Sequence, residues 1–289
     1  MKIAVNSGIL NRVCPLEESL ELIKAAGFDG VEISLDRIMK GPDDWDTRFQ
    51  GENYLDEARK LKKFIDELGL EVAQVCAPSA KFRADYYTNP YSYPMAVRSI
   101  EIAAELGAPV IIIKPIDRPA YFGNEEKLFE TSMDYYGRFA PIAERCGIKI
   151  ALENVCAFDF RRHGPGHHIC SKPEEHIRYL TALNEAYPDR FVACMDMGEP
   201  NLVCGYAEEN IRALGSRIAC THVHDNHYRK NDHCIPGHGV IDFHAISEAL
   251  KEIGYEGYYT LNCAVHLPRE LMPSALSHMA TVARYFAEK

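Results

Sequence analysis

The chain has 289 residues, a formal net charge of -10 at pH 7, 47% hydrophobic residues and 26% charged residues. The acidic balance argues against a nucleic-acid partner, because phosphate binding needs a surplus of Lys and Arg on one face. No apolar run approaches the roughly 20 residues of a membrane-spanning helix, and Asn6 and Ser7 interrupt the first apolar stretch too early for a signal peptide. We therefore expect a cytoplasmic globular protein that acts on a small molecule.

Short β-branched apolar runs alternate with segments of helical period along the whole chain. Eight runs are typical of strands: residues 3–5, 31–35, 71–76, 110–114, 148–153, 191–196, 218–224 and 258–263. The segments between them that are typical of helices include 16–26, 55–68, 96–106, 125–146, 173–186, 243–253 and 271–288. This pattern predicts an α/β fold, a (β/α)8 TIM barrel, which needs roughly 250 residues. A single domain over residues 1–289 is expected, and no GxGxxG follows the first strand to favour a doubly wound nucleotide-binding sheet.

The cysteines give no sign of a disulfide framework or of a zinc ribbon. The ten of them include no CxxC pair, and several fall inside predicted strands. We expect reduced, mostly buried thiols.

Ionisable and polar residues gather where the predicted strands end, which is the functional face of a TIM barrel. Glu153, Asp196 and His222 end three consecutive strands. Any one of them alone could be a hydrogen-bonded strand end, but two carboxylates and an imidazole in a row are ligands for a divalent cation. The sequence therefore predicts a metal site at this mouth.

The segment Thr-His-Val-His-Asp-Asn-His at 221–227 carries the highest density of such residues. Alternation along a strand sends His222 and His224 to the same face. We expect Asp225 to hold the neighbouring imidazole of His222 and to contact the substrate. His224 is either a catalytic group or a core histidine. All 12 histidines lie at or after His163, so the first half of the chain offers no imidazole ligand.

Five further residues are candidates for substrate contacts. Lys114 ends a strand, where it could pair with the carboxylates or polarise a substrate carbonyl, and Glu32 ends another strand. Arg83 lies in a tyrosine-rich segment that suits one wall of a sugar pocket. His168 and His233 lie in predicted loops and could bind substrate oxygens. Salt bridges, loop packing or solvated side chains would explain each of the five as well.

Six segments together resemble the xylose isomerase-like barrels, a superfamily of sugar isomerases, ketose 3-epimerases, inosose dehydratases and endonuclease IV. They are residues 25–33, 151–154, 195–198, 222–226, 236–243 and 254–261, of which the last three are fairly specific in order and spacing. The resemblance covers nearly the whole chain. It implies one divalent ion held by Glu, Asp, His and Glu from strands five to eight, and it implies a homodimer.

Carried onto this sequence, the first three ligands match Glu153, Asp196 and His222, with the acid of the motif at Asp225. The fourth position departs, because Asn262 stands where a Glu is expected, and Glu199 stands where the family usually has His. An Asn oxygen can ligate a metal but cannot exchange a proton. This argues against an epimerase with two metal-bound carboxylates, and leaves Glu199 or His224 as the second base beside Glu153.

The sequence thus predicts a metal-dependent isomerase or epimerase that acts on a sugar, keto-sugar or inosose through an enediolate. Dehydration of a keto-sugar is the first alternative, and a non-catalytic sugar-binding role, motivated by Asn262, is the second. An endonuclease IV-like hydrolase is disfavoured, because it would need three zinc ions and histidines where Glu32 and Cys76 stand. One His among oxygen ligands suits Mn, Mg, Co or Zn.

Overall fold

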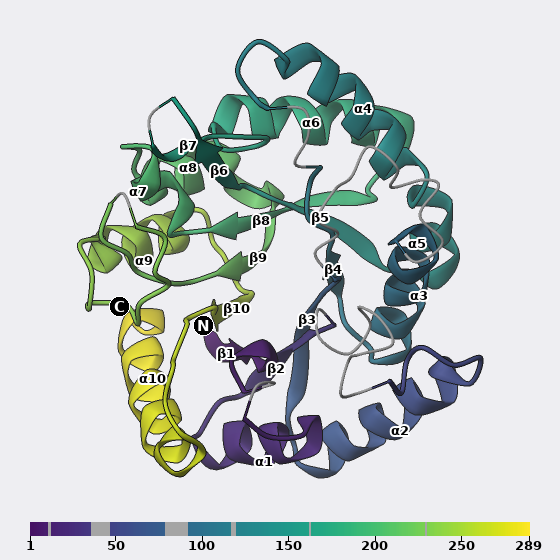
Figure 1. The fold of residues 1–289 in the computed structure, drawn as a ribbon, viewed down its shortest axis with the longest axis vertical. Helices are drawn as coiled ribbons and strands as arrows, with labels where there is room; N and C mark the ends of the chain where they lie inside the picture. Colours follow the sequence, from purple (N-terminus) through teal and green to yellow (C-terminus); the bar gives the residue numbers. More distant parts are fainter. Residues whose placement is uncertain (11–12, 36–46, 79–91, 117–119, 162, 229) are drawn as a thin grey trace.

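A ring of parallel strands forms the centre of the computed structural model, which describes residues 1–10, 13–35, 47–78, 92–116, 120–161, 163–228 and 230–289 (Figure 1). The strands are β1 Lys2–Asn6, β2 Gly30–Ser34, β3 Glu71–Cys76, β4 Val110–Ile112, β5 Lys149–Glu153, β8 Phe191–Asp196, β9 Ile218–His222 and β10 Tyr258–Leu261. Their order is β10-β1-β2-β3-β4-β5-β8-β9. The predicted fold, an eight-stranded α/β barrel, is confirmed.

The ring is joined between β9 and β10 by a single bridge, Val223 to Leu261. The Val223 amide donates to the Thr260 carbonyl at 2.8 Å, and the Asn262 amide donates to the Val223 carbonyl at 2.9 Å. We call this junction the seam. Each of the other neighbouring strand pairs is matched over at least two residues, so the barrel is nearly closed and the seam is its shortest strand pairing.

Helices surround the ring of strands (Figure 1). They are α1 Leu16–Ala25, α2 Tyr54–Glu67, α3 Ser92–Glu105, α4 Glu125–Gly137, α5 Ala140–Cys146, α6 Pro173–Ala186, α7 Glu199–Leu202, α8 Ala207–Leu214, α9 Phe243–Glu252 and α10 Met272–Ala287, with 3-10 turns η1 Ser7–Ile9, η2 Gly215–Arg217 and η3 Arg269–Leu271. None of the described helices is both long and apolar enough to cross a membrane.

Two parts of this arrangement differ from the predicted elements. The segment 125–146 forms two helices rather than one, and Pro141 lies in the first turn of α5, where a proline is tolerated although it would break a continuous helix. A hairpin of β6 Cys156–Asp159 and β7 Gly164–His167 follows β5. Its composition, with Gly164, Pro165 and Gly166, gives no β-propensity signal.

The interior of the barrel is filled by a small set of buried side chains, which we call the inner layer. It consists of Cys76, Val110, Ile112, Ala151, Cys194 and Cys220. A separate and larger core lies between the strands and the helices. All ten cysteines fall within the described residues and are free, as expected.

Candidate active site

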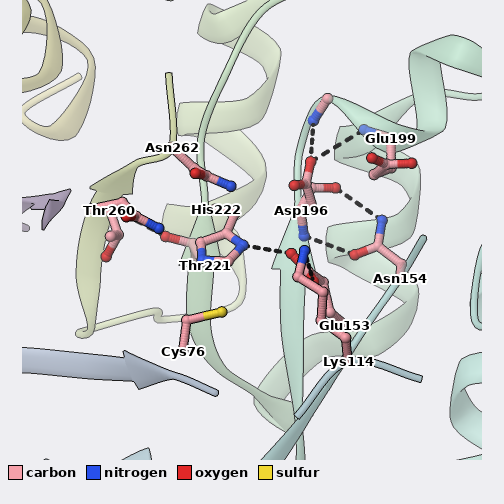
Figure 2. A network of polar contacts seen from close by, with 12 residues as sticks. Cys76, Lys114, Glu153, Asn154, Asp196, Glu199, Thr221, His222, Thr260 and Asn262 are labelled. Atoms are coloured by element: carbon pink, nitrogen blue, oxygen red, sulfur yellow. Dashed lines mark hydrogen bonds and ion pairs between the residues drawn. The ribbon is translucent and has the colours of Figure 1, made fainter. Parts of the chain in front are cut away.

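Ionisable side chains lie directly above the inner layer, at the C-terminal ends of the strands. Because side chains alternate along a strand, the inward-facing residue two positions beyond each inner-layer residue faces the same interior. Lys114 stands two positions after Ile112, and Glu153 two positions after Ala151. In the same way, Asp196 follows Cys194 and His222 follows Cys220. We call these four residues the charged layer (Figure 2).

His222 is held between two carboxylates. Its Nδ1 lies 2.5 Å from Glu153 Oε1 and its Nε2 lies 2.7 Å from Glu32 Oε2, and all three side chains are at most 2% exposed. Lys114 Nζ lies 2.9 Å from Glu153 Oε2. Burial alone would raise the pKa of Glu153, but Lys114 and His222 outweigh it and hold that pKa well below its usual value. Burial likewise lowers the pKa of His222, and Glu32 and Glu153 together raise it well above its usual range.

Glu32, predicted to contact the substrate, is fully buried and faces His222. Its oxygens accept hydrogen bonds from Asn6 and from Gln74 Nε2 in addition to His222. Gln74 Nε2 also donates to the Thr221 carbonyl at 3.1 Å, which ties this network to β9. A carboxylate on one ring nitrogen of a histidine fixes the ring and leaves the other nitrogen for a ligand.

Asp196, Glu199 and His224 form a second cluster beside the charged layer. His224 Nε2 lies 3.0 Å from Asp196 Oδ1, and the same oxygen accepts the amides of Gly198 and Glu199 at 2.9 and 3.2 Å. Only glycine fits at position 198, because a Cβ there would lie 2.0 Å from His224 Cε1. The backbone turn after β8 therefore fixes both the carboxylate of Asp196 and the ring of His224.

Glu199 is buried at the start of α7. Its Oε2 accepts the Cys156 amide at 2.6 Å, and its Oε1 accepts Asn231 Nδ2 at 3.1 Å. Burial and the nearby charge of Asp196 raise the pKa of Glu199 to about 7. The two alternatives for the second base, Glu199 and His224, thus lie together in one cluster with Asp196.

Asp225 does not hold the ring of His222, and this prediction is wrong. Its carboxylate accepts backbone amides, those of Asn226, Gly237, Gly239, Val240 and Ile241. These bonds fasten the loop before α9 to the end of β9. With its oxygens facing the loop, Asp225 is also unsuited to the predicted contact with substrate.

The other predicted residues fall into three places. His233 Nδ1 lies 2.8 Å from the Asn262 carbonyl oxygen, and the His233 ring stacks on His224 with centroids 3.8 Å apart. His168 is buried, with its ring 6.0 Å from that of Tyr121, and it lines a different pocket. Arg83 lies outside the described residues.

A pocket of about 460 Å³ opens over the charged layer. Its lining includes Ser34, Cys76, Lys114, His222, His233 and Asn262. This volume is in the range of small-molecule sites. The predicted residues Lys114, His222, His233 and Asn262 are therefore brought to one cavity.

Metal-ligating atoms at the mouth form two groups, each within 4.8 Å: Glu153 with Cys194 and His222, and Asp196 with Glu199 and His224. The predicted set is thus divided, since Asp196 is in the second group. The residues nevertheless fit a divalent ion, because nitrogen and oxygen donors face one another and Glu32 orients the imidazole. Cys194 was missed as a donor, although its position two residues before Asp196 places it on the same face of the strand.

A family model described as the xylose isomerase-like TIM barrel matches residues 20–282. The chain belongs to this family. Within the family, the chain is similar to 3-dehydro-D-guloside 4-epimerase of Escherichia coli, with 23% identity over 83% of this chain and 84% of the relative. It is also similar to inosose dehydratase of Clostridium beijerinckii, with 25% identity over 84% of this chain and 80% of the relative.

The solved structure of the IolI protein with a binding zinc atom shares the fold. It superimposes with a TM-score of 0.74 at 19% identity, covering 99% of this chain and 96% of that chain. The curated relatives of this chain thus include a sugar epimerase and an inosose dehydratase.

Proposed function

We propose that this chain is a metal-dependent isomerase or epimerase that moves a proton on a carbon next to a carbonyl group of a sugar, keto-sugar or inosose. One observation carries the proposal. The buried Glu153 carboxylate lies between Lys114 Nζ and His222 Nδ1, at 2.9 and 2.5 Å, at the mouth of the barrel. The activities named for the relatives, epimerisation of a dehydro-guloside and dehydration of an inosose, both act beside a carbonyl group and support it.

Glu153, His222 and Asp196 would hold the metal ion, with Asn262 and Cys194 as further donors. When bound, a divalent ion supplies Lewis-acid polarisation of the substrate carbonyl, which acidifies the adjacent C–H. The zinc of the IolI structure supports such a site. Burial raises the pKa of the Cys194 thiol well above its usual value, so Cys194 would be a weaker donor than the carboxylates and the imidazole.

The side chains divide the proton transfers between them. Glu153 is the general base that takes the proton from carbon, which leaves the enediolate of the substrate. Lys114, at 2.9 Å from Glu153, provides positive charge beside the oxygen that becomes negative. Glu199 or His224, grouped with Asp196 on the other side, returns the proton.

A cytoplasmic location and a homodimer remain predictions from the sequence.

The test is Glu153→Gln in protein loaded with manganese or zinc, assayed on a panel of ketoses, aldoses and inososes. Turnover should fall by about 10²- to 10⁴-fold, because the amide cannot accept the proton. Substrate affinity, measured by calorimetry, should change little. Glu126→Gln is the matched control, since Glu126 is an exposed surface residue paired with Arg178.

Three results would change the proposal. Retained turnover in Glu153→Gln would remove Glu153 as the base. Loss of water from an inosose, without isomerisation, would identify a dehydratase. Binding of a panel sugar with no turnover in the wild-type chain would favour the non-catalytic role that Asn262 suggested.

A further inference from the structure

A third group of metal-ligating side chains lies in the loop that joins β9 to α9 (Figure 1). It consists of His227, Asp232 and Cys234, whose ligand atoms all lie within 4.8 Å of one another. These three residues do not line the pocket over the charged layer, and neither the proposed reaction nor its metal ligands use them. We call this group the loop cluster.

The imidazole of His227 contacts both other members of the loop cluster through one atom. Its Nδ1 lies 3.0 Å from Asp232 Oδ2 and 3.9 Å from Cys234 Sγ. A ring nitrogen carries either one proton or one lone pair, so it cannot hydrogen-bond to the carboxylate and to the thiol together. A cation between the three atoms would bind all of them at once. Ligand atoms of a tetrahedral zinc ion lie about 3.3–3.6 Å apart, and the two distances fall on either side of this range.

The carboxylate of Asp232 is mostly buried and has an oxygen without a partner. The side chain is 17% exposed, and its buried Oδ1 accepts no hydrogen bond from the described residues, although the Cys234 thiol lies nearby. Oδ2 also faces Lys230 Nζ at 3.6 Å, but the Lys230 side chain is 77% exposed and can turn into solvent. A buried carboxylate oxygen without a partner is unfavourable, and a bound cation would compensate for it.

The thiol of Cys234 completes the donor set. It is half-buried, unlike the buried Cys194. Burial and the charge of Asp232 raise the pKa of Cys234, so the thiol keeps its proton when no metal is bound. The negative charge that retains the proton also attracts a cation, and a metal ion displaces the proton when it binds. One sulfur, one nitrogen and one oxygen suit zinc with a water as fourth ligand, whereas magnesium and calcium take oxygen ligands.

His233 lies between two members of the loop cluster in the sequence. Its φ is 48°, in the left-handed region that residues with a Cβ seldom adopt. In this conformation His233 Nδ1 lies 2.8 Å from the Asn262 carbonyl oxygen, while Asp232 and Cys234 contact His227. A metal ion bound to both flanking residues would hold this backbone turn, and with it the position of His233 beside the candidate active site.

We propose that the loop cluster binds one zinc ion through His227 Nδ1, Cys234 Sγ and the carboxylate of Asp232. This ion has a structural role, because it fastens the loop between β9 and α9 and holds His233 in place. The site does not depend on the proposed reaction, and it stands whether or not the charged layer holds a metal ion of its own.

The zinc content of each chain tests the site directly. Reduced full-length protein is equilibrated with zinc in the presence of a competing chelator, and the bound zinc is counted by elemental analysis. Cys234→Ser and His227→Ala should each hold one zinc ion fewer than wild type. Affinity at this site should fall at least about 100-fold, because loss of a ligand costs more than loss of the partner behind one. The His227 side chain is 53% exposed, so its removal leaves the fold intact.

Cys204→Ser and His244→Ala are the matched controls, since both residues are exposed and lie outside the loop cluster. Both should hold as much zinc as wild type. Cobalt(II) then identifies the sulfur ligand, because a thiolate bound to cobalt gives a charge-transfer absorption in the near ultraviolet. This absorption should be present in wild type and in Cys204→Ser, and it should be lost in Cys234→Ser.

Equal zinc contents in wild type, Cys234→Ser and His227→Ala would overturn the proposal. A cobalt–thiolate absorption that persists undiminished in Cys234→Ser would also overturn it, by assigning the sulfur ligand to Cys194. If the charged layer bound no ion, wild type would hold one zinc ion and the two loop-cluster variants none. The difference of one ion therefore remains even if the proposed function fails.

Discussion

The inner layer and the charged layer are stacked within the same barrel and have opposite chemistry. Along β5, Ala151 belongs to the first and Glu153 to the second, and along β8 the same step leads from Cys194 to Asp196. One pleat of a strand, about 7 Å at roughly 3.3 Å per residue, separates them. The inner layer excludes water from below, so the charges above it depend on one another rather than on solvent.

This difference explains why the charged layer is paired so completely. Glu153 contacts Lys114 and His222, and His222 contacts both Glu153 and Glu32. A buried charge without a partner costs several kcal/mol. The strand ends can therefore hold ionised groups only as a set, and the layer beneath can hold none.

The largest effect on stability is expected when a charged side chain is placed in the inner layer. Ile112 is fully buried in the inner layer. Ile112→Asp should lower the free energy of unfolding by at least about 3 kcal/mol, because the carboxylate would lack a partner there. Urea denaturation measures this. Ile112→Val is the control and should lower the free energy of unfolding by only about 1 kcal/mol. If Ile112→Asp were as stable as Ile112→Val, the proposed difference between the two layers would be refuted.

A smaller effect, on metal affinity, is expected when the contact between Glu32 and His222 is removed. Glu32→Gln removes the carboxylate that faces His222 Nε2 at 2.7 Å. Affinity for zinc or manganese, measured against a competing chelator, should fall about 10- to 100-fold, as for other carboxylates behind a histidine ligand. Glu71→Gln, at an exposed position, is the matched control. Unchanged metal affinity would show that Glu32 does not orient a ligand.

The smallest effect concerns a buried histidine outside the charged layer. His176 on α6 donates from Nε2 to the Leu152 carbonyl at 3.1 Å, and burial lowers the pKa of His176 to about 4. Its pKa in the unfolded chain is about 6.5, so the neutral form is favoured in the fold. The contribution of neutral His176 to the free energy of unfolding is fully present above pH 6.5. It is lost as the pH falls toward 4, by about 1.4 kcal/mol per pH unit.

The pH dependence should therefore be less steep in His176→Gln than in wild type, within that window. Unfolding free energies from urea curves at pH 7, 6 and 5 provide the measurement. His244→Gln, at an exposed position, should follow the wild-type curve. Parallel curves for wild type and His176→Gln would show that the pKa of His176 is not lowered in the folded chain.

The fold could be predicted because its signals are local. Apolar runs gave the positions of the eight strands, and alternation brought Glu153, Asp196 and His222 to one mouth. The strand predicted over 218–224 ends at His222, since the chain beyond it makes only the seam bridge through Val223. The hairpin after β5 was missed, because two glycines and a proline form one of its strands.

The partners within the site could not be predicted, because they depend on distances across the barrel. Glu32 and His222 lie 190 positions apart in the sequence and 2.7 Å apart in the fold. Asp225 was assigned to the ring of His222 on sequence adjacency, yet its neighbours in space are the amides of a loop more than ten residues later. Side-chain direction at the end of a strand, which decides both cases, leaves no trace in a residue pattern.

The seam has a consequence for how the molecule moves. A sheet that closes through one bridge, between Val223 and Leu261, opens there before it opens elsewhere. His222 immediately precedes Val223 in the sequence, and Asn262 immediately follows Leu261. Amide hydrogen exchange should accordingly be faster at Val223 and Asn262, which flank the ends of β9 and β10, than at the paired residues inside the strands. Because His222 and Asn262 both line the pocket over the charged layer, opening of this bridge would widen the pocket from the side without movement of the helices.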